Sequence, residues 1–282
     1  MIKFHEEIFL DIQTADSLVV DLDRYVNKKS LSKIMGGRFT MPNTSEGFKE
    51  LLSKSKSWAA VYQKLSSTEF LSTCMELLDM PSANVKFNPY FSQRIIPQKL
   101  KRVEALKFKQ IHETSQSGLC AYLIYSFWKR FCFYLFRMRF WFSKKIQLDI
   151  LFDISQSENG YVREIHRDTD SRYIVFLLYL NNLSGTGEGG ELNLFKYTGK
   201  SENNPNPQPT QENCSLIRKI APSKGKLVIF KNSHEAFHSV SEMSGYEGDR
   251  IFCYGSFTVL SGKNPNFNKI TKKLKTEWKF YL

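Results

Sequence analysis

The 282-residue sequence has few cysteines, few histidines and no long hydrophobic run free of charge. Its five cysteines are odd in number and scattered, with no Cys-x-x-Cys pair, which excludes a disulfide framework and a zinc finger and predicts reduced thiols. Charged residues interrupt the first twenty positions, so we expect no signal peptide. The most apolar stretch, 119–142, contains four basic residues and is a poor membrane-spanning segment. We therefore expect a soluble, cytoplasmic protein.

The positive charge is concentrated in two regions. Lys and Arg total 40 against 28 Asp and Glu, which gives a formal net charge of +12. Residues 94–145 hold twelve basic and two acidic side chains, and residues 263–282 hold six lysines and one glutamate. Such segments are typical of solvated helix faces and tails. Nucleic acid or an anionic membrane surface would also suit them as a partner, but no nucleic-acid-binding motif supports this alternative.

The apolar pattern divides the chain into three parts. Residues 1–145 are predicted to be a mainly helical N-terminal region that supports the core, and the spacing over 55–80 fits amphipathic helices, with Thr68 near the start of the second. Residues 146–262 are predicted to be a core of short strands, and 263–282 a basic, helical C-terminal tail. Proline- and asparagine-rich stretches at 81–98 and 201–213 predict irregular connections.

Short strands dominate the predicted core. The segment 172–180 is apolar at nearly every position, which is typical of a strand buried on both faces. The glycine-rich run 185–190 predicts a turn. Short strands without intervening helices indicate a β-sandwich or barrel, so the fold class is mainly β with helical support (α+β). The remaining predicted strands lie at 146–154, 191–197, 216–220, 225–230 and 250–260.

Three of the five histidines fall within 166–238, and they suggest a metal site. His166 and Asp168 are two residues apart, so in an extended segment both side chains project from one face. A third ligand would come from His234 or His238, and we favour His238 because it begins an extended segment after a strand. Two histidines and one carboxylate cover one face of an octahedral ion, as in non-haem Fe(II) oxygenases, although zinc is an alternative.

Arg250 and Tyr179 are candidates for binding an anion. Arg250 opens the last predicted strand, and a buried arginine there would need an anion, which a dicarboxylate would supply through a bidentate pair. Tyr179 would add a phenolic hydrogen bond. The alternatives are a surface salt bridge between Arg250 and Asp249 or a nearby glutamate, and ordinary strand packing for Tyr179. The residues alone leave these alternatives open.

The order of these residues resembles the prolyl-4-hydroxylase-type branch of the Fe(II)/2-oxoglutarate-dependent dioxygenases. The resemblance covers about residues 146–260 and departs from the family at Gln156, where many relatives have a tyrosine, and in the extra loop at 201–213. The matching segments are Gly160-Tyr161-Val162-Arg163 before His166 and Asp168, Arg172 through Tyr179-Leu180-Asn181, Gly189-Gly190-Glu191-Leu192, Gly225–Phe230, His238-Ser239-Val240 and Arg250.

The resemblance implies a double-stranded β-helix, or jelly-roll, core. It implies His166, Asp168 and His238 as the catalytic iron ligands and Arg250, helped by Tyr179, as the anchor of 2-oxoglutarate. The implied cofactors are Fe(II), 2-oxoglutarate as cosubstrate and O2, with ascorbate as a reductant. The implied reaction hydroxylates an unactivated C–H bond while 2-oxoglutarate is converted to succinate and CO2.

The substrate is left open by the sequence. We expect a prolyl or other amino-acid-like group, presented by a peptide or a small molecule. Two alternatives are a jelly-roll metal enzyme that does not use 2-oxoglutarate, and a basic module on the same fold that binds nucleic acid or a membrane.

Overall fold

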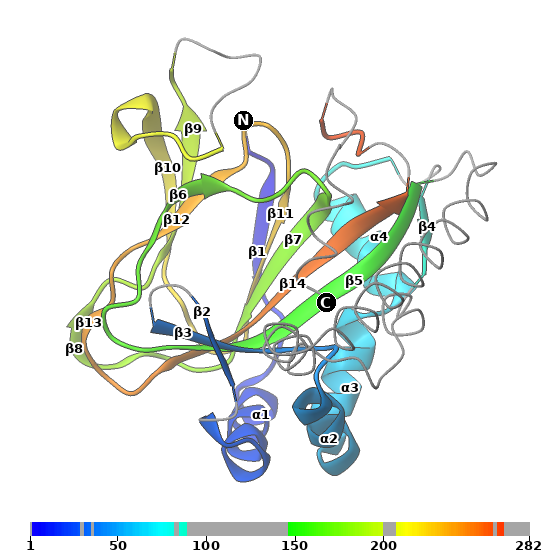
Figure 1. Cartoon of the computed structure of the whole chain (residues 1–282), viewed down its shortest axis with the longest axis vertical. Helices are drawn as coiled ribbons and strands as arrows, with labels where there is room; N and C mark the ends of the chain where they lie inside the picture. Colours follow the sequence, from blue (N-terminus) through cyan, green and yellow to red (C-terminus); the bar gives the residue numbers. More distant parts are fainter. Residues whose placement is uncertain are drawn as a thin grey trace, which may run out of the picture.

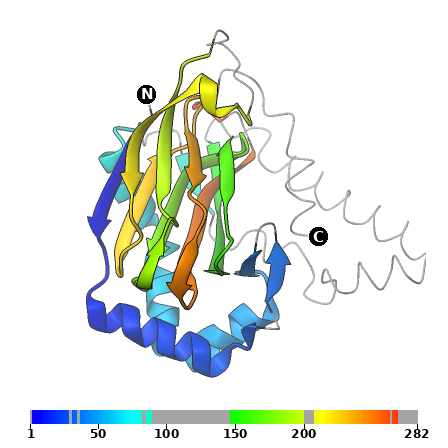
Figure 2. The ribbon, with the colours of Figure 1, turned by 90° about the vertical axis from the view of Figure 1, so that its left-hand side faces the viewer.

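The computed structural model describes residues 2–28, 31–34, 37–81, 85–88, 146–199, 207–261 and 264–267. Within these residues the strands form a large and a small sheet that face each other, and helices cover the other side of the large sheet (Figure 1). Figure 2 shows helix α1 (Ile12–Tyr25) running across one end of the strands. The predicted class, mainly β with helical support around a jelly-roll core, is confirmed.

The large sheet has eight strands in the order β1-β11-β7-β14-β5-β3-β2, with β4 added beside β5. Only the β4–β5 pair is parallel, and the other pairs are antiparallel. The strands are β1 (Phe4–Ile8), β2 (Ser32–Ile34), β3 (Arg38–Pro42), β4 (Val85–Phe87), β5 (Ile146–Ser157), β7 (Arg172–Tyr179), β11 (Lys226–Lys231) and β14 (Arg250–Ser261).

The small sheet has the order β10-β9-β12-β6, and β13 and β8 form a separate two-stranded sheet. All of these pairs are antiparallel. The strands are β6 (Arg163–Arg167), β8 (Ser184–Glu188), β9 (Leu192–Tyr197), β10 (Cys214–Ile220), β12 (Phe237–Val240) and β13 (Ser244–Glu247), with a short 3-10 helix, η3, at Gln211–Asn213.

Side-chain caps fix where the helices begin. Helices α2 (Glu46–Lys54), α3 (Lys56–Leu65) and α4 (Thr68–Leu77) each follow a serine whose hydroxyl accepts a hydrogen bond from a first-turn N–H. Such caps satisfy backbone donors that have no partner inside the helix. Ser55 ends α2 and begins α3, so these two helices meet at a tight corner. The amphipathic helices predicted over 55–80 are confirmed as α3 and α4.

Strand β7 separates the two hydrophobic layers, as a strand buried on both faces does. Ile174, Phe176 and Leu178 pack against the helices, whereas Val175, Leu177 and Tyr179 face the small sheet. This alternation is the period of two expected for a strand. The prediction that 172–180 is buried on both faces is confirmed.

The structure differs from the predicted elements in two places. The described part of 1–145 adds strands β1 to β4 to the large sheet, which the sequence did not predict because runs of three to five residues show little alternation. The predicted turn at 185–190 is wrong for its first part. Residues Ser184–Glu188 form β8, paired with β13, and only Gly189 and Gly190 make the turn.

Several predictions fall outside the described residues. These are the whole basic segment 94–145, residues 201–206 of the loop at 201–213, and the tail at 263–282 except for 264–267. Cys74, Cys214 and Cys253 are unpaired and buried, in keeping with reduced thiols.

None of the helices in the described ranges has the length and apolar character needed to cross a membrane.

Gly255 offers a test of the packing between β14 and the helices. It lies opposite Phe176 on β7, and a Cβ at Gly255 would come within 2.0 Å of the Phe176 ring. We expect Gly255→Ala to lower the free energy of unfolding by about 1–3 kcal/mol, measured by urea denaturation, because the ring must move out of a packed core. The exposed Ser215→Ala on β10 should change it by less than about 0.5 kcal/mol.

The double variant Gly255→Ala/Phe176→Leu should lose less stability than the sum of the two single changes, since the smaller side chain relieves the clash. Strict additivity would contradict the packing described here.

Candidate metal centre

Three side chains converge between the two sheets. His166 on β6 and His238 on β12 are direct cross-strand partners, and Asp168 follows β6 at once. One ligand atom from each residue lies within 4.8 Å of the other two. The two imidazole rings are 4.3 Å apart at their centres, and His238 Nε2 is 3.7 Å from Asp168 Oδ2. The fold therefore brings together the three residues that the sequence proposed as ligands.

His234, the other histidine considered as a third ligand, lies outside this group. Its Nδ1 is 3.1 Å from Arg167 Nη1, and its ring packs edge-on against Phe267 at 4.7 Å. His234 is therefore not one of the three residues whose ligand atoms converge.

Main-chain carbonyls set the orientation of both imidazoles. His166 Nδ1 is 2.8 Å from the carbonyl of Glu164, and His238 Nδ1 is 3.1 Å from that of Ala236. A carbonyl only accepts hydrogen bonds, so each Nδ1 carries the proton and each Nε2 keeps its lone pair. The lone pair of His166 faces the triad and Arg163, whose Nε is 3.5 Å away, at the long limit of a hydrogen bond. This is the tautomer that binds a metal through Nε2.

Burial keeps both imidazoles neutral. Burial, with a smaller contribution from the neighbouring His238, lowers the pKa of His166 to about 3, although Asp168 opposes this shift. Burial also lowers the pKa of His238. Both rings are therefore neutral near pH 7, which is the form required of a metal ligand.

Asp168 is held in place by two further side chains. Arg172 Nη1 donates to its Oδ1 at 2.7 Å, and the Tyr254 hydroxyl donates to its Oδ2 at 3.1 Å. Burial alone would raise the pKa of Asp168, but the charge and the hydrogen bond of Arg172 lower it, so the carboxylate is ionised. The sequence alone indicated no role for Arg172 or Tyr254, although Arg172 is only four residues after Asp168.

This donor set suits a divalent transition metal. Two neutral imidazole nitrogens and one oriented carboxylate are the facial triad of non-haem Fe(II) sites, and zinc accepts the same ligands. The hydrogen-bonded second layer around each ligand is also the arrangement that metal sites use. The residues therefore fit the Fe(II) that the resemblance implies.

Arg250 is a buried cation in the same space between the sheets. Its side chain is 1% exposed and its guanidinium lies over the rings of Tyr161 and Phe252, at 5.3 and 4.7 Å from their centres. Arg250 Nη1 donates to the carbonyl of Gly190. Among the described residues no carboxylate pairs with it. The alternative of a salt bridge to Asp249 is wrong, since Asp249 pairs with Lys28 instead.

The Gly-Gly turn makes this contact possible. Gly189 and Gly190 both have positive φ, at 86° and 79°. A Cβ at Gly189 would lie 1.6 Å from the carbonyl oxygen of Glu242, so the chain can pass only without a side chain. The turn thereby presents the Gly190 carbonyl to Arg250.

Tyr179 and Arg250 each keep a buried polar atom without a partner. The Tyr179 hydroxyl and Arg250 Nε have no hydrogen-bond partner within the described part of the chain, although both side chains are fully buried. Burial raises the pKa of Tyr179 to about 12, so its hydroxyl is a donor. Buried donors without partners are rare, and a ligand carboxylate would satisfy both. Gln156 lies on the opposite face of β5 from Ser157, by strand alternation, and adds nothing to this space.

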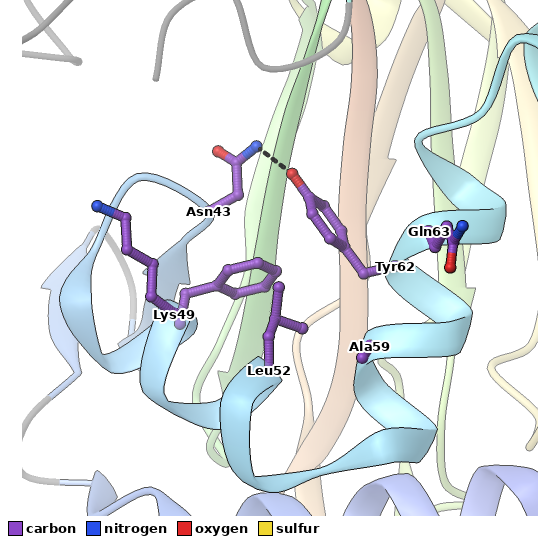
Figure 3. A pocket seen from close by; sticks show the side chains of 7 residues that line it. Asn43, Lys49, Leu52, Ala59, Tyr62 and Gln63 are labelled. Atoms are coloured by element: carbon purple, nitrogen blue, oxygen red, sulfur yellow. Dashed lines mark hydrogen bonds between the residues drawn. The ribbon is translucent and has the colours of Figure 1, made fainter. Parts of the chain in front are cut away.

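A separate hollow lies on the far side of the large sheet, between α2 and α3 (Figure 3). Its volume is about 380 Å³, and the Asn43 amide donates to the Tyr62 hydroxyl at 3.0 Å inside it. No histidine, cysteine or carboxylate lines it, so it offers no metal ligands. The lining residues are Asn43, Phe48, Lys49, Leu52, Ala59, Tyr62 and Gln63.

Comparisons with known proteins agree with this geometry. Residues 152–257 match the family model of the 2OG-Fe(II) oxygenase superfamily. The chain is 32% identical over 132 residues to prolyl 3-hydroxylase OGFOD1 of Mus musculus, a match that covers 45% of this chain and 22% of that protein. The match therefore spans only about a fifth of the length of this curated relative.

Two solved structures are similar to this chain, and the first of them supports the fold. A prolyl 4-hydroxylase from Phytophthora capsici is 15% identical with a TM-score of 0.50, over 99% of this chain and 67% of that one. A prolyl-4-hydroxylase from Pseudomonas putida is 14% identical with a TM-score of 0.41, over 93% of this chain and 95% of that one. The segment 152–257, which is similar to the 2OG-Fe(II) oxygenase superfamily, contains all three converging ligands, Arg250 and Tyr179.

Proposed function

We propose that the chain is an Fe(II)- and 2-oxoglutarate-dependent dioxygenase that hydroxylates an unactivated C–H bond. The observation that carries this proposal is the convergence of His166, Asp168 and His238 ligand atoms within 4.8 Å, in the same inter-sheet space as the buried Arg250. A metal site alone would suit many reactions, and the buried guanidinium is what points to an anionic cosubstrate.

The triad would hold Fe(II) on one face of its coordination sphere. The carbonyls of Glu164 and Ala236 keep each imidazole Nε2 directed at the ion, and Arg172 and Tyr254 keep Asp168 in position. When bound, Fe(II) supplies activation of dioxygen, with electrons from the oxidative decarboxylation of 2-oxoglutarate to succinate and CO2. The protein supplies ligand geometry and orientation.

Arg250 and Tyr179 would bind the distal carboxylate of 2-oxoglutarate. Arg250 Nε and the Tyr179 hydroxyl are donors without partners in the described part, and both lie in a region closed to water. A charge-assisted hydrogen bond in such a site is strong because the surroundings screen it little.

A prolyl or other amino-acid-like group is the proposed substrate, in a peptide or a small molecule. The name of the mouse relative, a prolyl 3-hydroxylase, supports this class. Ascorbate is proposed as a reductant. The basic segments 94–145 and 263–282 lie almost wholly outside the described residues, so a nucleic-acid or membrane partner has no structural support.

The direct test measures succinate formed from 2-oxoglutarate by protein loaded with Fe(II) under anaerobic conditions and then exposed to oxygen. Wild type should form succinate. His166→Ala should reduce the rate at least about 100-fold through loss of a ligand, and Arg250→Ala should raise the KM for 2-oxoglutarate at least about 10-fold. Arg218→Ala, an exposed arginine on β10, is the matched control and should behave as wild type.

Equal succinate yields in wild type, His166→Ala and Arg250→Ala would contradict the proposed function. Metal-dependent turnover of a substrate without 2-oxoglutarate would favour the other kind of jelly-roll metal enzyme.

Tyr254→Phe tests the hydrogen bond that orients Asp168. The substitution removes one hydroxyl and keeps the ring, so the carboxylate loses a donor at 3.1 Å. We expect the affinity for Mn(II), a stand-in for Fe(II), to fall about 10-fold in isothermal titration calorimetry, with little change in Tm. Tyr246→Phe is the matched control, because its hydroxyl donates to the Gly189 carbonyl away from the triad. Equal affinities in all three proteins would show that Asp168 needs no help from Tyr254.

A further inference from the structure

Three guanidinium groups and two aromatic rings alternate along the inner face of β14. The Arg250 and Arg38 guanidinium carbons lie 4.7 and 5.2 Å from the centre of the Phe252 ring. Arg38 and Arg172 in turn lie 5.3 and 4.9 Å from the centre of the Tyr254 ring. Arginine stacks on aromatic faces in this manner, and the contact holds a guanidinium in a fixed plane. Arg38 therefore occupies the middle of an ordered row.

The register of three neighbouring strands brings Arg38 beside Arg250. Ser157 on β5 is the direct partner of Arg38 on β3 and of Arg250 on β14. Direct partners project from the same face of a sheet, so both arginines flank the small Ser157 side chain on the face toward the small sheet. The Ser157 hydroxyl is buried and has no hydrogen-bond partner in the described part of the chain.

Of the two arginines, only Arg38 has a carboxylate partner among the described residues. Arg38 Nη2 donates to Asp153 Oδ1 at 2.8 Å and Arg38 Nε donates to the Ser155 hydroxyl at 3.0 Å, which leaves further N–H groups of its planar fork for another acceptor. The Arg38 side chain is 16% exposed, and Arg250 is fully buried without a carboxylate among the described residues. Two cations in a poorly solvated space with one anion favour the binding of a further anion.

The row runs from the metal triad to the cosubstrate anchor. At one end, Tyr254 and Arg172 both bind Asp168, and at the other end lies Arg250. A dicarboxylate that reaches from the triad to Arg250 would follow the inner face of β14 past Phe252, where Arg38 lies. The N-terminal strand β3 lies beside β5 in the large sheet (Figure 1), and its Arg38 contacts the Phe252 and Tyr254 rings of β14.

We propose that Arg38 is a second cosubstrate-binding residue, which holds the dianionic 2-oxoglutarate together with Arg250. This inference rests on the proposed function, because it takes 2-oxoglutarate as the ligand of the space between the triad and Arg250. Arg38 then does more than tie β3 to β5 through Asp153.

The test is isothermal titration of 2-oxoglutarate into the full-length protein loaded with Mn(II) under anaerobic conditions. Arg38→Gln should weaken 2-oxoglutarate binding by about 10-fold or more, as expected for loss of a charge-assisted contact, and should leave the affinity for Mn(II) unchanged. Arg250→Gln is the positive control. Arg218→Gln, which removes an exposed arginine paired with Glu6, should bind like wild type.

Asp153→Asn distinguishes a role of Arg38 in binding 2-oxoglutarate from a purely structural role. It breaks the same ion pair as Arg38→Gln but keeps the guanidinium, so both variants should lower Tm while only Arg38→Gln loses affinity for 2-oxoglutarate. If Arg38→Gln does not fold, Arg38→Lys keeps the charge without the planar fork, and its affinity should fall by about 3-fold or more.

The possible failures are distinguishable. Loss of binding in Arg250→Gln with wild-type affinity in the folded Arg38 variants would overturn this inference alone. A wild-type protein that binds Mn(II) but not 2-oxoglutarate would overturn both this inference and the proposed function.

Discussion

The candidate site depends first on the register between β6 and β12. His166 and His238 are direct partners across this pair, so their side chains leave the sheet on the same face. A slip of one residue would turn one imidazole to the outer face and separate the ligands. The outer face helps to fix the register, because Ile165 and Phe237, the neighbours of the two histidines, pack there with Phe195. Apolar contacts on one side of the small sheet thereby position polar ligands on the other.

The two faces of the large sheet also differ in character. The face toward the helices is apolar and well packed, with Phe176 against Phe70 and Phe152. The face toward the small sheet carries polar atoms without partners in the described part, including the hydroxyls of Ser157 and Tyr179. Such groups destabilise a folded chain unless a ligand satisfies them. The helix-covered side therefore carries the larger apolar cluster, whereas the other side combines apolar packing with polar atoms that a ligand could satisfy.

The sequence predicted most of what depends on local pattern. The strand through Tyr179, the ligand pair His166 and Asp168, and the extended segment at His238 follow from alternation and spacing, and the structure has them together. The contact between Tyr254 and Asp168 joins residues 86 apart, and no local pattern reports it. Strand β3 was not predicted because its five residues show little alternation and its partner β5 lies more than one hundred residues further along the chain.

Strand β14 connects the two halves of the site, and alternation explains how. Arg250, Phe252 and Tyr254 are two residues apart, so they share the inner face of one rigid strand that neighbours β5 and β7. Arg250 and the Tyr254 hydroxyl that donates to Asp168 are therefore held at a fixed separation by backbone geometry, independent of any loop. Because β3 continues the same sheet beyond β5, the described N-terminal residues share a wall with the metal centre as well as supporting it. A change in the packing of β3 would consequently alter the position of Arg38 and its ion pair with Asp153 beside the site.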